Sequence, residues 1–302
     1  MGRRRDAAWS STPGIGALAR PFAAMQMRHD EAAVTNESVA RRYRVVPYPR
    51  RRQPVLDVLA TAAWHYTIHG LIEVDVTAAR NRLAREPQQV SFTAFVVATV
   101  ARAVAEHSQV SARRTGRRLV LFDDVDVVVT IERPLDGTPT PMPTILHRLD
   151  TKSCADITAE LTAIRLRPVT RAGDLTGNRL VTAVPGVIRR LALRAAGRVP
   201  AAAARFAPPV GISSLGMFDA GGWGIPLSPM TLMVTVGGIL HRPAFVDGEL
   251  QERQLLPLTL SFDHAVVDGA PAARFSATLR RLFETAAALD DTGTADHDSR
   301  SA

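Results

Sequence analysis

The sequence predicts an α/β fold, in which a mixed sheet carries helices packed on it. Three observations lead to this prediction: strand-like runs alternate with helix-like segments, an Asp-Gly pair marks a hairpin, and the last apolar segment has helical periodicity. The chain has 302 residues, of which 46% are hydrophobic and 22% charged. These values are typical of a globular protein with a core of normal size.

The first half of the chain begins this alternation. Apolar and acidic residues alternate at Leu71–Val76, which predicts a half-buried strand, and Thr77 can then cap a short helix through Arg85. The run SFTAFVVATVARAVAEHS predicts a largely buried helix whose N-cap is Ser91 or Thr93.

The middle of the chain adds two strands, a helix and an arginine-rich segment. The strands are predicted at Val125–Ile131 and Pro143–Leu146. Ser153 and Asp156 resemble a capping box and begin a helix that runs to about Arg167. Within residues 166–207, whose role the sequence leaves open, VIRRLALRAAGRV is consistent with a short amphipathic helix. Its basic face is either a membrane or polyanion patch or, as we favour, a solvated surface.

The last third predicts three strands, a hairpin and a helix. The strands are expected at Pro209–Ser214, Leu232–Val236 and Leu256–Asp263, and Val246–Glu249 (VDGE) supplies the hairpin turn. Gly269 opens the helix, whose apolar side consists of Ala272, Phe275, Leu279, Leu282 and Phe283.

One folded unit is expected over residues 43–286. Residues 1–42 lack a sustained period and predict a flexible N-terminal arm. Residues 287–302 have no large apolar residue beyond Leu289 and predict a disordered C-terminal tail.

Composition points away from several protein classes. The formal charge of +8 comes from arginines that are scattered along the chain, and aromatic residues make up only 5%, so we expect no nucleic-acid partner. Cys154 is the single cysteine, which indicates a reducing compartment. The sequence shows no signal peptide and no run of 18 apolar residues. We therefore expect a cytoplasmic protein without a membrane partner.

The motif that carries chemistry is Ser261–Gly269 (SFDHAVVDG). His264 follows a strand and precedes a glycine turn, where a histidine with a pKa near 6.5 can act as a general base. Asp268 lies across the turn and can orient neighbouring groups or pair with an arginine. A buried, hydrogen-bonded histidine and a helix-capping aspartate explain the same spacing, and the residues alone leave this choice open.

These residues also resemble a known family, the dihydrolipoyl acyltransferase catalytic domain of 2-oxoacid dehydrogenase complexes, within the chloramphenicol acetyltransferase-like superfamily. SFDHAVVDGAPAARF is similar to the family signature DHRxxDGAxxARF. Four other segments match in the same order: LIEVDVT, SFTAFVVATVARAVAEHSQVSA, ISSLGMF and FVDGELQERQLLPLTL.

The resemblance implies a CoA-dependent acyltransferase fold that forms a homotrimer, or a larger assembly of trimers, with active sites between subunits. It implies that His264 is the general base and that Ser213, contributed across the interface, donates a hydrogen bond to the oxyanion. It also implies that Asp268 is structural and pairs with an arginine, for which Arg50, Arg51 and Arg52 are the candidates. CoA or acyl-CoA is the expected substrate.

Departures from the family pattern leave the acyl acceptor open. The chain shows no lipoyl domain, and Lys152 does not match a lipoylation site, so a stand-alone form without a covalently bound lipoyl group is expected. The expected acceptor is a dihydrolipoamide-like thiol, for which a lipoyl domain in trans is one candidate carrier. Ala265 in place of the family's arginine keeps open an acetyltransferase that acts on a small-molecule hydroxyl. A non-catalytic trimeric scaffold is the third alternative.

No metal site is expected from the sequence. His65 and His69 are four residues apart, but the residues between them suit a strand or turn and not a metal-binding helix. Cys154 is interpreted as structural, because no histidine is suitably placed beside it.

Overall fold

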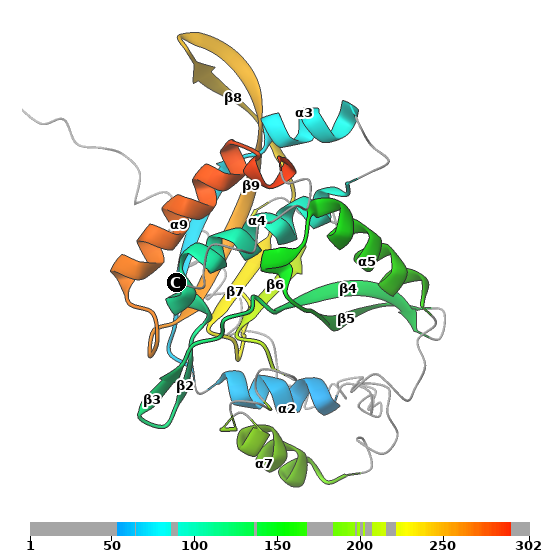
Figure 1. The fold of residues 1–302 in the computed structure, drawn as a ribbon, viewed down its shortest axis with the longest axis vertical. Helices are drawn as coiled ribbons and strands as arrows, with labels where there is room; N and C mark the ends of the chain where they lie inside the picture. Colours follow the sequence, from blue (N-terminus) through cyan, green and yellow to red (C-terminus); the bar gives the residue numbers. More distant parts are fainter. Residues whose placement is uncertain are drawn as a thin grey trace, which may run out of the picture. The chain divides into compact units, whose positions relative to one another are not determined.

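The computed structural model describes residues 53–63, 65–85, 90–135, 138–167, 184–196, 198–199, 202, 207–215 and 222–290. They all lie in one compact unit, Tyr48–Ala302. The predicted N-terminal arm, residues 1–42, lies outside the described residues, as do Arg50, Arg51 and Arg52. Within this unit, the mixed sheet with packed helices confirms the predicted fold class (Figure 1).

The sheet has seven strands. They are β1 (Thr67–Asp75), β4 (Val127–Leu135), β5 (Thr138–Leu146), β6 (Val210–Ser214), β7 (Leu232–Val236), β8 (Leu240–Val246) and β9 (Glu249–Asp263). The order is β1-β9-β7-β6-β4-β5, and β8 pairs with the first part of β9. β6 runs parallel to both β4 and β7, whereas the other pairs are antiparallel.

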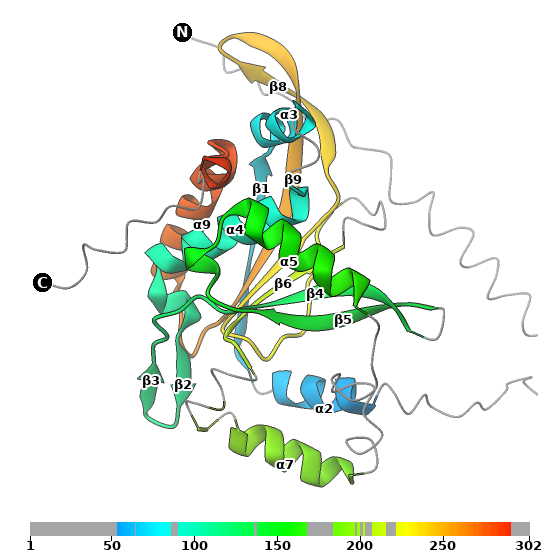
Figure 2. The same ribbon diagram turned by 45° about the vertical axis from the view of Figure 1, so that its right-hand side comes forward.

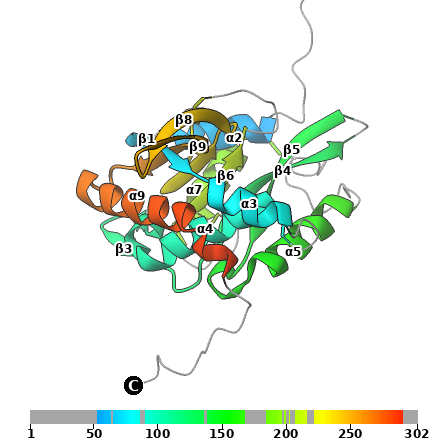
Figure 3. The ribbon, with the colours of Figure 1, turned by 90° about the horizontal axis from the view of Figure 1, so that it is seen from above.

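Helices cover one face of this sheet (Figures 1 and 3). α4 (Phe92–Glu106) packs against α5 (Cys154–Leu166) and α9 (Gly269–Glu284), and α9 also contacts β1. Phenylalanines join the layers: the Phe95 and Phe283 rings are 5.6 Å apart and the Phe262 and Phe275 rings 5.9 Å apart, both edge to face. Such pairs add about 0.5–1.5 kcal/mol to the burial of their area.

The helix starts follow their capping residues. The Ser91 side chain accepts a hydrogen bond from Ala94 N at the start of α4, and Ser153 and Asp156 form a capping box at α5. α9 begins at Gly269, and its five predicted apolar residues are all buried. Capping residues therefore predict the starts of α4 and α5, and apolar periodicity predicts α9. α3 (Thr77–Arg85) ends at the predicted residue, but Thr77 is its first residue and not its cap, and the Thr77 N–H donates to Asp75 Oδ1.

β9 provides the frame of the site. Its side chains alternate, so that Leu256, Leu258, Leu260 and Phe262 enter the core under the helices. Thr259, Ser261 and Asp263 point to the other face of the sheet. The helix-free face of the central strands is therefore polar.

Two hairpins extend from the sheet region. Asp247 and Gly248 both have positive φ, 52° and 85°, as a two-residue turn between β8 and β9 requires. The sequence predicted this turn. A second hairpin, β2 (Arg113–Thr115) and β3 (Arg118–Val120), turns at Gly116, whose φ is 62°, and was not predicted.

Two further helices pack on each other. They are α2 (Gln53–Ala62), which was not predicted, and α7 (Gly186–Ala196), which confirms the short helix expected in residues 166–207. In Figure 2, α7 lies beyond α2, on the side away from the sheet. None of the helices in the described ranges is long and apolar enough to cross a membrane.

The folded chain extends beyond two predicted boundaries. β5 begins at Thr138, five residues before the predicted strand. The tail predicted from Ala287 is still ordered at its start, because residues 287–289 form a 3-10 helix in which Ala288 is only 1% exposed. This small residue fills a gap beside α4, and the expectation of a tail without large apolar residues missed that contact.

Candidate active site

His264 is the first residue after β9 and lies in a turn that the chain itself fixes. Its backbone N–H donates to Tyr66 O at 2.6 Å. The N–H groups of Val266 and Val267 both donate to Asp263 O at 2.9 Å. The His264 side chain is nevertheless 47% exposed. The backbone is therefore held while the imidazole remains open to a substrate.

The partner of the His264 ring determines which nitrogen carries the proton. Nδ1 lies 3.1 Å from Val267 O, and a carbonyl oxygen can only accept. Nδ1 therefore donates in the neutral ring, which leaves the lone pair on Nε2. This is the arrangement that a general base needs. A buried histidine, the alternative interpretation, does not fit the exposure.

Asp268 is at the N-cap position of α9 but is 84% exposed at its side chain. Its carboxylate makes no side-chain cap, and its Oδ1 lies 3.7 Å from His264 Nδ1. Among the described residues no arginine pairs with Asp268, and the three candidate arginines lie outside them. The capping interpretation is therefore wrong, and the arginine partner stays a prediction.

Asp263 and His65 hold the turn that carries His264. Neither residue was predicted from the sequence to belong to the site. His65 Nδ1 lies 2.9 Å from Asp263 Oδ2, close enough for an ion pair although poorly angled for a hydrogen bond. The N–H of Ala265 donates to Asp263 Oδ1 at 3.0 Å. Burial opposes ionisation of Asp263, but His65, the Ala265 N–H and the charge of Arg114 together lower its pKa. The contact arises from the antiparallel pairing of β1 with β9, which brings His65 to the end of β9 and leaves no local signal in the sequence.

Ser213 lies on β6, far from His264 in the same chain. Its register partners are Thr235 on β7 and, through Thr235, Thr259 on β9. His264 is five residues beyond Thr259. At about 3.3 Å per residue and about 4.8 Å per strand spacing, Ser213 and His264 are roughly 15–20 Å apart. One chain therefore does not bring the two side chains to the same reacting atom.

Buried hydroxyls continue the row that Ser213 begins. Thr235 is 3% and Thr259 0% exposed, and neither hydroxyl has a hydrogen-bond partner in the described part of the chain. They are directly opposite each other on β7 and β9. This row could not be predicted from the sequence, because only the strand register aligns the three hydroxyls.

A pocket of about 350 Å³ opens on the other face of β6. Ile212 and Ser214 line it together with apolar residues of α4, but Ser213 and His264 do not. The pocket therefore does not complete the candidate site.

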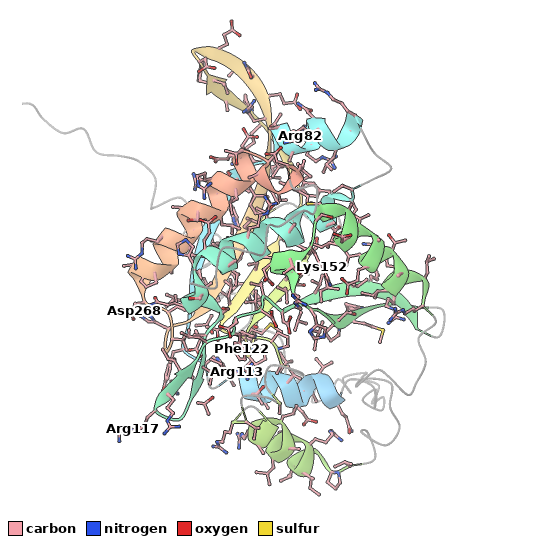
Figure 4. The ribbon with its side chains drawn as sticks, viewed as in Figure 1. Arg82, Arg113, Arg117, Phe122, Lys152 and Asp268 are labelled. Atoms are coloured by element: carbon pink, nitrogen blue, oxygen red, sulfur yellow. The ribbon has the colours of Figure 1, made fainter. Side chains whose placement is uncertain are left out.

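Positive charge lies near the His264 end of the sheet. Arg114, on β2, is close enough to Asp263 to favour its ionised form. Figure 4 labels Arg117 at the tip of the same hairpin and Asp268 at the start of α9, at the same end of the sheet. The hairpin therefore presents arginines beside the turn that carries His264.

The other residues considered for chemistry have local partners. His69 Nδ1 lies 2.9 Å from Ser261 Oγ on the neighbouring strand. Cys154 is buried, and its thiol donates to Ala288 O at 3.1 Å. Within the described ranges, no group of three or more His, Cys, Asp or Glu residues could hold a metal ion.

Comparison with known proteins assigns the chain to one family. The family model for the 2-oxoacid dehydrogenases acyltransferase catalytic domain matches residues 41–180 and 209–289. A mitochondrial dihydrolipoyllysine-residue succinyltransferase of the 2-oxoglutarate dehydrogenase complex from Saccharomyces cerevisiae is 28% identical over 176 residues, 56% of this chain. The match covers 30% of that relative, so the chain spans less than a third of its length.

Two solved structures have a similar fold. A probable dihydrolipoamide acetyltransferase from Listeria monocytogenes has a TM-score of 0.60 and 19% identity, covering 84% of this chain and 98% of that one. The cubic core of the pyruvate dehydrogenase multienzyme complex has a TM-score of 0.59 and 20% identity, covering 86% and 99%. Ser213, His264 and Asp268 all lie in the family-matched region.

Proposed function

Because the chain belongs to the family of 2-oxoacid dehydrogenase acyltransferase catalytic domains, we propose that it transfers an acyl group between CoA and a dihydrolipoamide-like thiol. The observation that carries this proposal is the His264 imidazole, which is open to solvent and whose Nδ1 faces Val267 O. The family implies acyl transfer, and the ring geometry supplies the base that such a transfer needs.

The proposed reaction needs one base and one oxyanion donor. Nε2 of His264 takes the proton from the acceptor thiol as its sulfur attacks the thioester carbonyl carbon. The new C–S bond produces a tetrahedral intermediate, whose oxyanion accepts a hydrogen bond from the Ser213 hydroxyl. The bond to the leaving sulfur then breaks, and the imidazolium returns the proton to that thiolate. Atoms and charge balance over the two steps.

The distance between Ser213 and His264 supports an active site between two copies of the chain. We propose a homotrimer, or a larger assembly of trimers, in which His264 of one copy faces Ser213 of the next. The fold likeness to the cubic core of the pyruvate dehydrogenase multienzyme complex agrees with this proposal. A lipoyl domain on another chain is the proposed carrier of the acceptor thiol.

The arginine hairpin is the proposed contact for CoA. Arg114, Arg117 and Arg118 lie on β2, its turn and β3, next to the His264 end of the sheet. CoA carries phosphates at a distance from its thiol, and arginine side chains bind phosphates bidentately. This placement directs the thiol end of CoA toward His264.

The experiment is an acyl-transfer assay with acetyl-CoA and free dihydrolipoamide, in which S-acetyl-dihydrolipoamide is measured by chromatography and mass spectrometry. His264→Ala is expected to lower kcat by about 10²–10⁴-fold, the usual contribution of a general base. His241→Ala is the matched control, because His241 is an exposed histidine on β8, away from the turn.

Three results contradict the proposal. Equal rates for His264→Ala and the wild type exclude the general base. Transfer to small alcohols in preference to dihydrolipoamide favours the hydroxyl acetyltransferase. Absence of CoA binding by calorimetry, with an intact trimer, favours the non-catalytic scaffold.

A further inference from the structure

α7 lies in a stretch of the chain that the family model does not match. The model skips residues 181–208, and α7 occupies Gly186–Ala196. In Figures 1 and 2 the helix lies outside α2, the element against which it packs. α7 is therefore additional to the matched acyltransferase domain, and the proposed reaction gives it no role.

The side of α7 that contacts α2 carries charge. Arg189 Nε lies 2.6 Å from Asp57 Oδ2, and Arg190 Nε lies 3.1 Å from Asp57 Oδ1. The side chains of Asp57 and Arg189 are only 5% and 10% exposed. Removing one partner would leave a buried charge alone, so this ion pair fixes which side of α7 faces the protein.

The other side of α7 is apolar and open to solvent. Val187, Ile188 and Leu191 share one helix face and are 73%, 55% and 63% exposed. A surface helix normally buries its apolar face and exposes its charged face. α7 instead keeps apolar residues open to solvent, and the expected solvated basic face holds only in part, because Arg189 is buried against Asp57 while Arg190 is 48% exposed. A clustered apolar surface of this kind is typical of an interaction site.

Charge distinguishes between the possible partners of this face. Residues 184–199 contain four arginines and no acidic residue, and the neighbouring helix α2 contributes only the buried Asp57. Arg194 follows Leu191 by three residues in α7, Arg198 lies just beyond the end of the helix, and both are exposed. The same face of a second copy would bring arginines against arginines. A bilayer with anionic lipids instead offers an apolar interior and phosphates side by side.

We propose that α7 binds the surface of a membrane that contains anionic lipids. Val187, Ile188 and Leu191 insert between the headgroups, and the exposed arginines contact the lipid phosphates. At 1.5 Å per residue, the 11 residues of α7 are about 16 Å long, which suits a helix that lies in the interface and does not cross it. The enzyme is thereby held at the membrane peripherally, and raised salt weakens the attachment.

Flotation of the full chain with phosphatidylcholine vesicles, with and without phosphatidylglycerol, tests this proposal. The wild type is expected to float only with the anionic vesicles. Ile188→Glu combined with Leu191→Glu is expected to lower the bound fraction at least about tenfold, because both side chains leave the apolar layer. The matched control is Phe245→Glu with Leu250→Glu, two residues of the β8–β9 hairpin that are 79% and 66% exposed. This control adds the same two negative charges but leaves α7 unchanged, so its bound fraction is expected to fall only slightly.

A second readout reports insertion directly. Leu191→Trp is expected to shift its fluorescence to shorter wavelength when anionic vesicles are added, whereas Phe245→Trp is not. The proposal is overturned if the wild type does not bind anionic vesicles at low salt, or if the two double variants lose binding equally. It is also overturned if the wild type does not bind vesicles and the α7 variant forms a smaller assembly in sedimentation. The last result assigns the face to contact between copies.

Discussion

The turn at His264 and the strand around Ser213 are held in different ways. The turn is fixed inside one chain by backbone hydrogen bonds to Tyr66 and Asp263 and by the contact of Asp263 with His65. On β6, Ser213 is partly buried, and its neighbour Thr235 has a buried hydroxyl without a described partner. The His264 part of the proposed site is therefore preorganised within the chain, whereas the Ser213 part depends on the group that another copy of the chain brings to it.

The base and the oxyanion donor therefore have separate structural requirements. The base needs a fixed tautomer and an open ring, which local bonds provide. The oxyanion donor needs a position relative to a carbonyl that another copy of the chain would present. Variants can therefore test the two halves one at a time.

After loss of the His264 base, removing the Ser213 hydroxyl is expected to have the next largest effect. Ser213→Ala should lower kcat by about 10²–10³-fold with little change in KM, because the hydroxyl stabilises charge that develops only in the transition state. Ser214→Ala on the same strand is the control, since Ser214 points to the opposite face. Equal losses of kcat for the two variants would show that the Ser213 hydroxyl has no specific role as an oxyanion donor.

Mixing the two inactive variants tests whether the halves come from different copies. When His264→Ala and Ser213→Ala chains are co-expressed and assemble at random, a contact with an intact histidine and an intact serine forms in about one quarter of the cases. The activity should recover to about that fraction of the wild type. If each chain carried a complete site, the mixture would stay as inactive as its components.

Loss of the Asp263 charge should affect stability and the geometry of the turn together. Asp263→Asn is expected to lower the free energy of unfolding by about 1–3 kcal/mol, because the contact with His65 weakens while the side chain stays buried. Urea unfolding measures this change. A double-mutant cycle with His65→Gln should show coupling between the two residues. Additive losses would mean that the 2.9 Å contact contributes nothing of its own.

The smallest predicted effect is the dependence of stability on pH. The pKa of Asp263 is lowered in the folded protein, so its contribution is present above the unfolded pKa of about 3.9 and is lost as the pH falls through the folded pKa. The unfolding free energy of the wild type should therefore decrease below about pH 4, and that of Asp263→Asn should decrease less. Glu249→Gln, at an exposed position on β9, should follow the wild-type curve.

Periodic and capped elements could be predicted from the sequence. α9 begins at the predicted residue because Asp268 and Gly269 interrupt the chain there, and its apolar spacing has the helical period. β9 was predicted only from Leu256. Its first residues, Glu249–Glu252, are exposed in the hairpin with β8 and therefore show no apolar pattern.

β5 shows why other boundaries could not be predicted. Pro139, Pro141 and Pro143 alternate along it, and proline normally argues against a strand because it cannot donate to the ladder. β5 is at the edge of the sheet and pairs only with β4, so the missing N–H groups can face outward. Edge position is a property of the fold and not of the local sequence.

The site was predictable in its residues but not in its arrangement. The motif located His264 and Asp268, and the resemblance added Ser213. The sequence alone could not show that Asp263 and His65 support the turn, because that contact joins residues 198 positions apart. The open apolar face of α7 was equally hidden, since amphipathic spacing does not say which face Asp57 will bind.

The burial of Cys154 has a consequence for a protein whose proposed substrates are thiols and thioesters. A free cysteine on the surface would exchange with them, accept acyl groups in a side reaction, and form mixed disulfides with oxidised lipoamide. Cys154 is instead 3% exposed, with its thiol directed at the carbonyl of Ala288 in the closing 3-10 helix. The short segment after α9 thus keeps the protein's own sulfur out of the chemistry that it is proposed to catalyse.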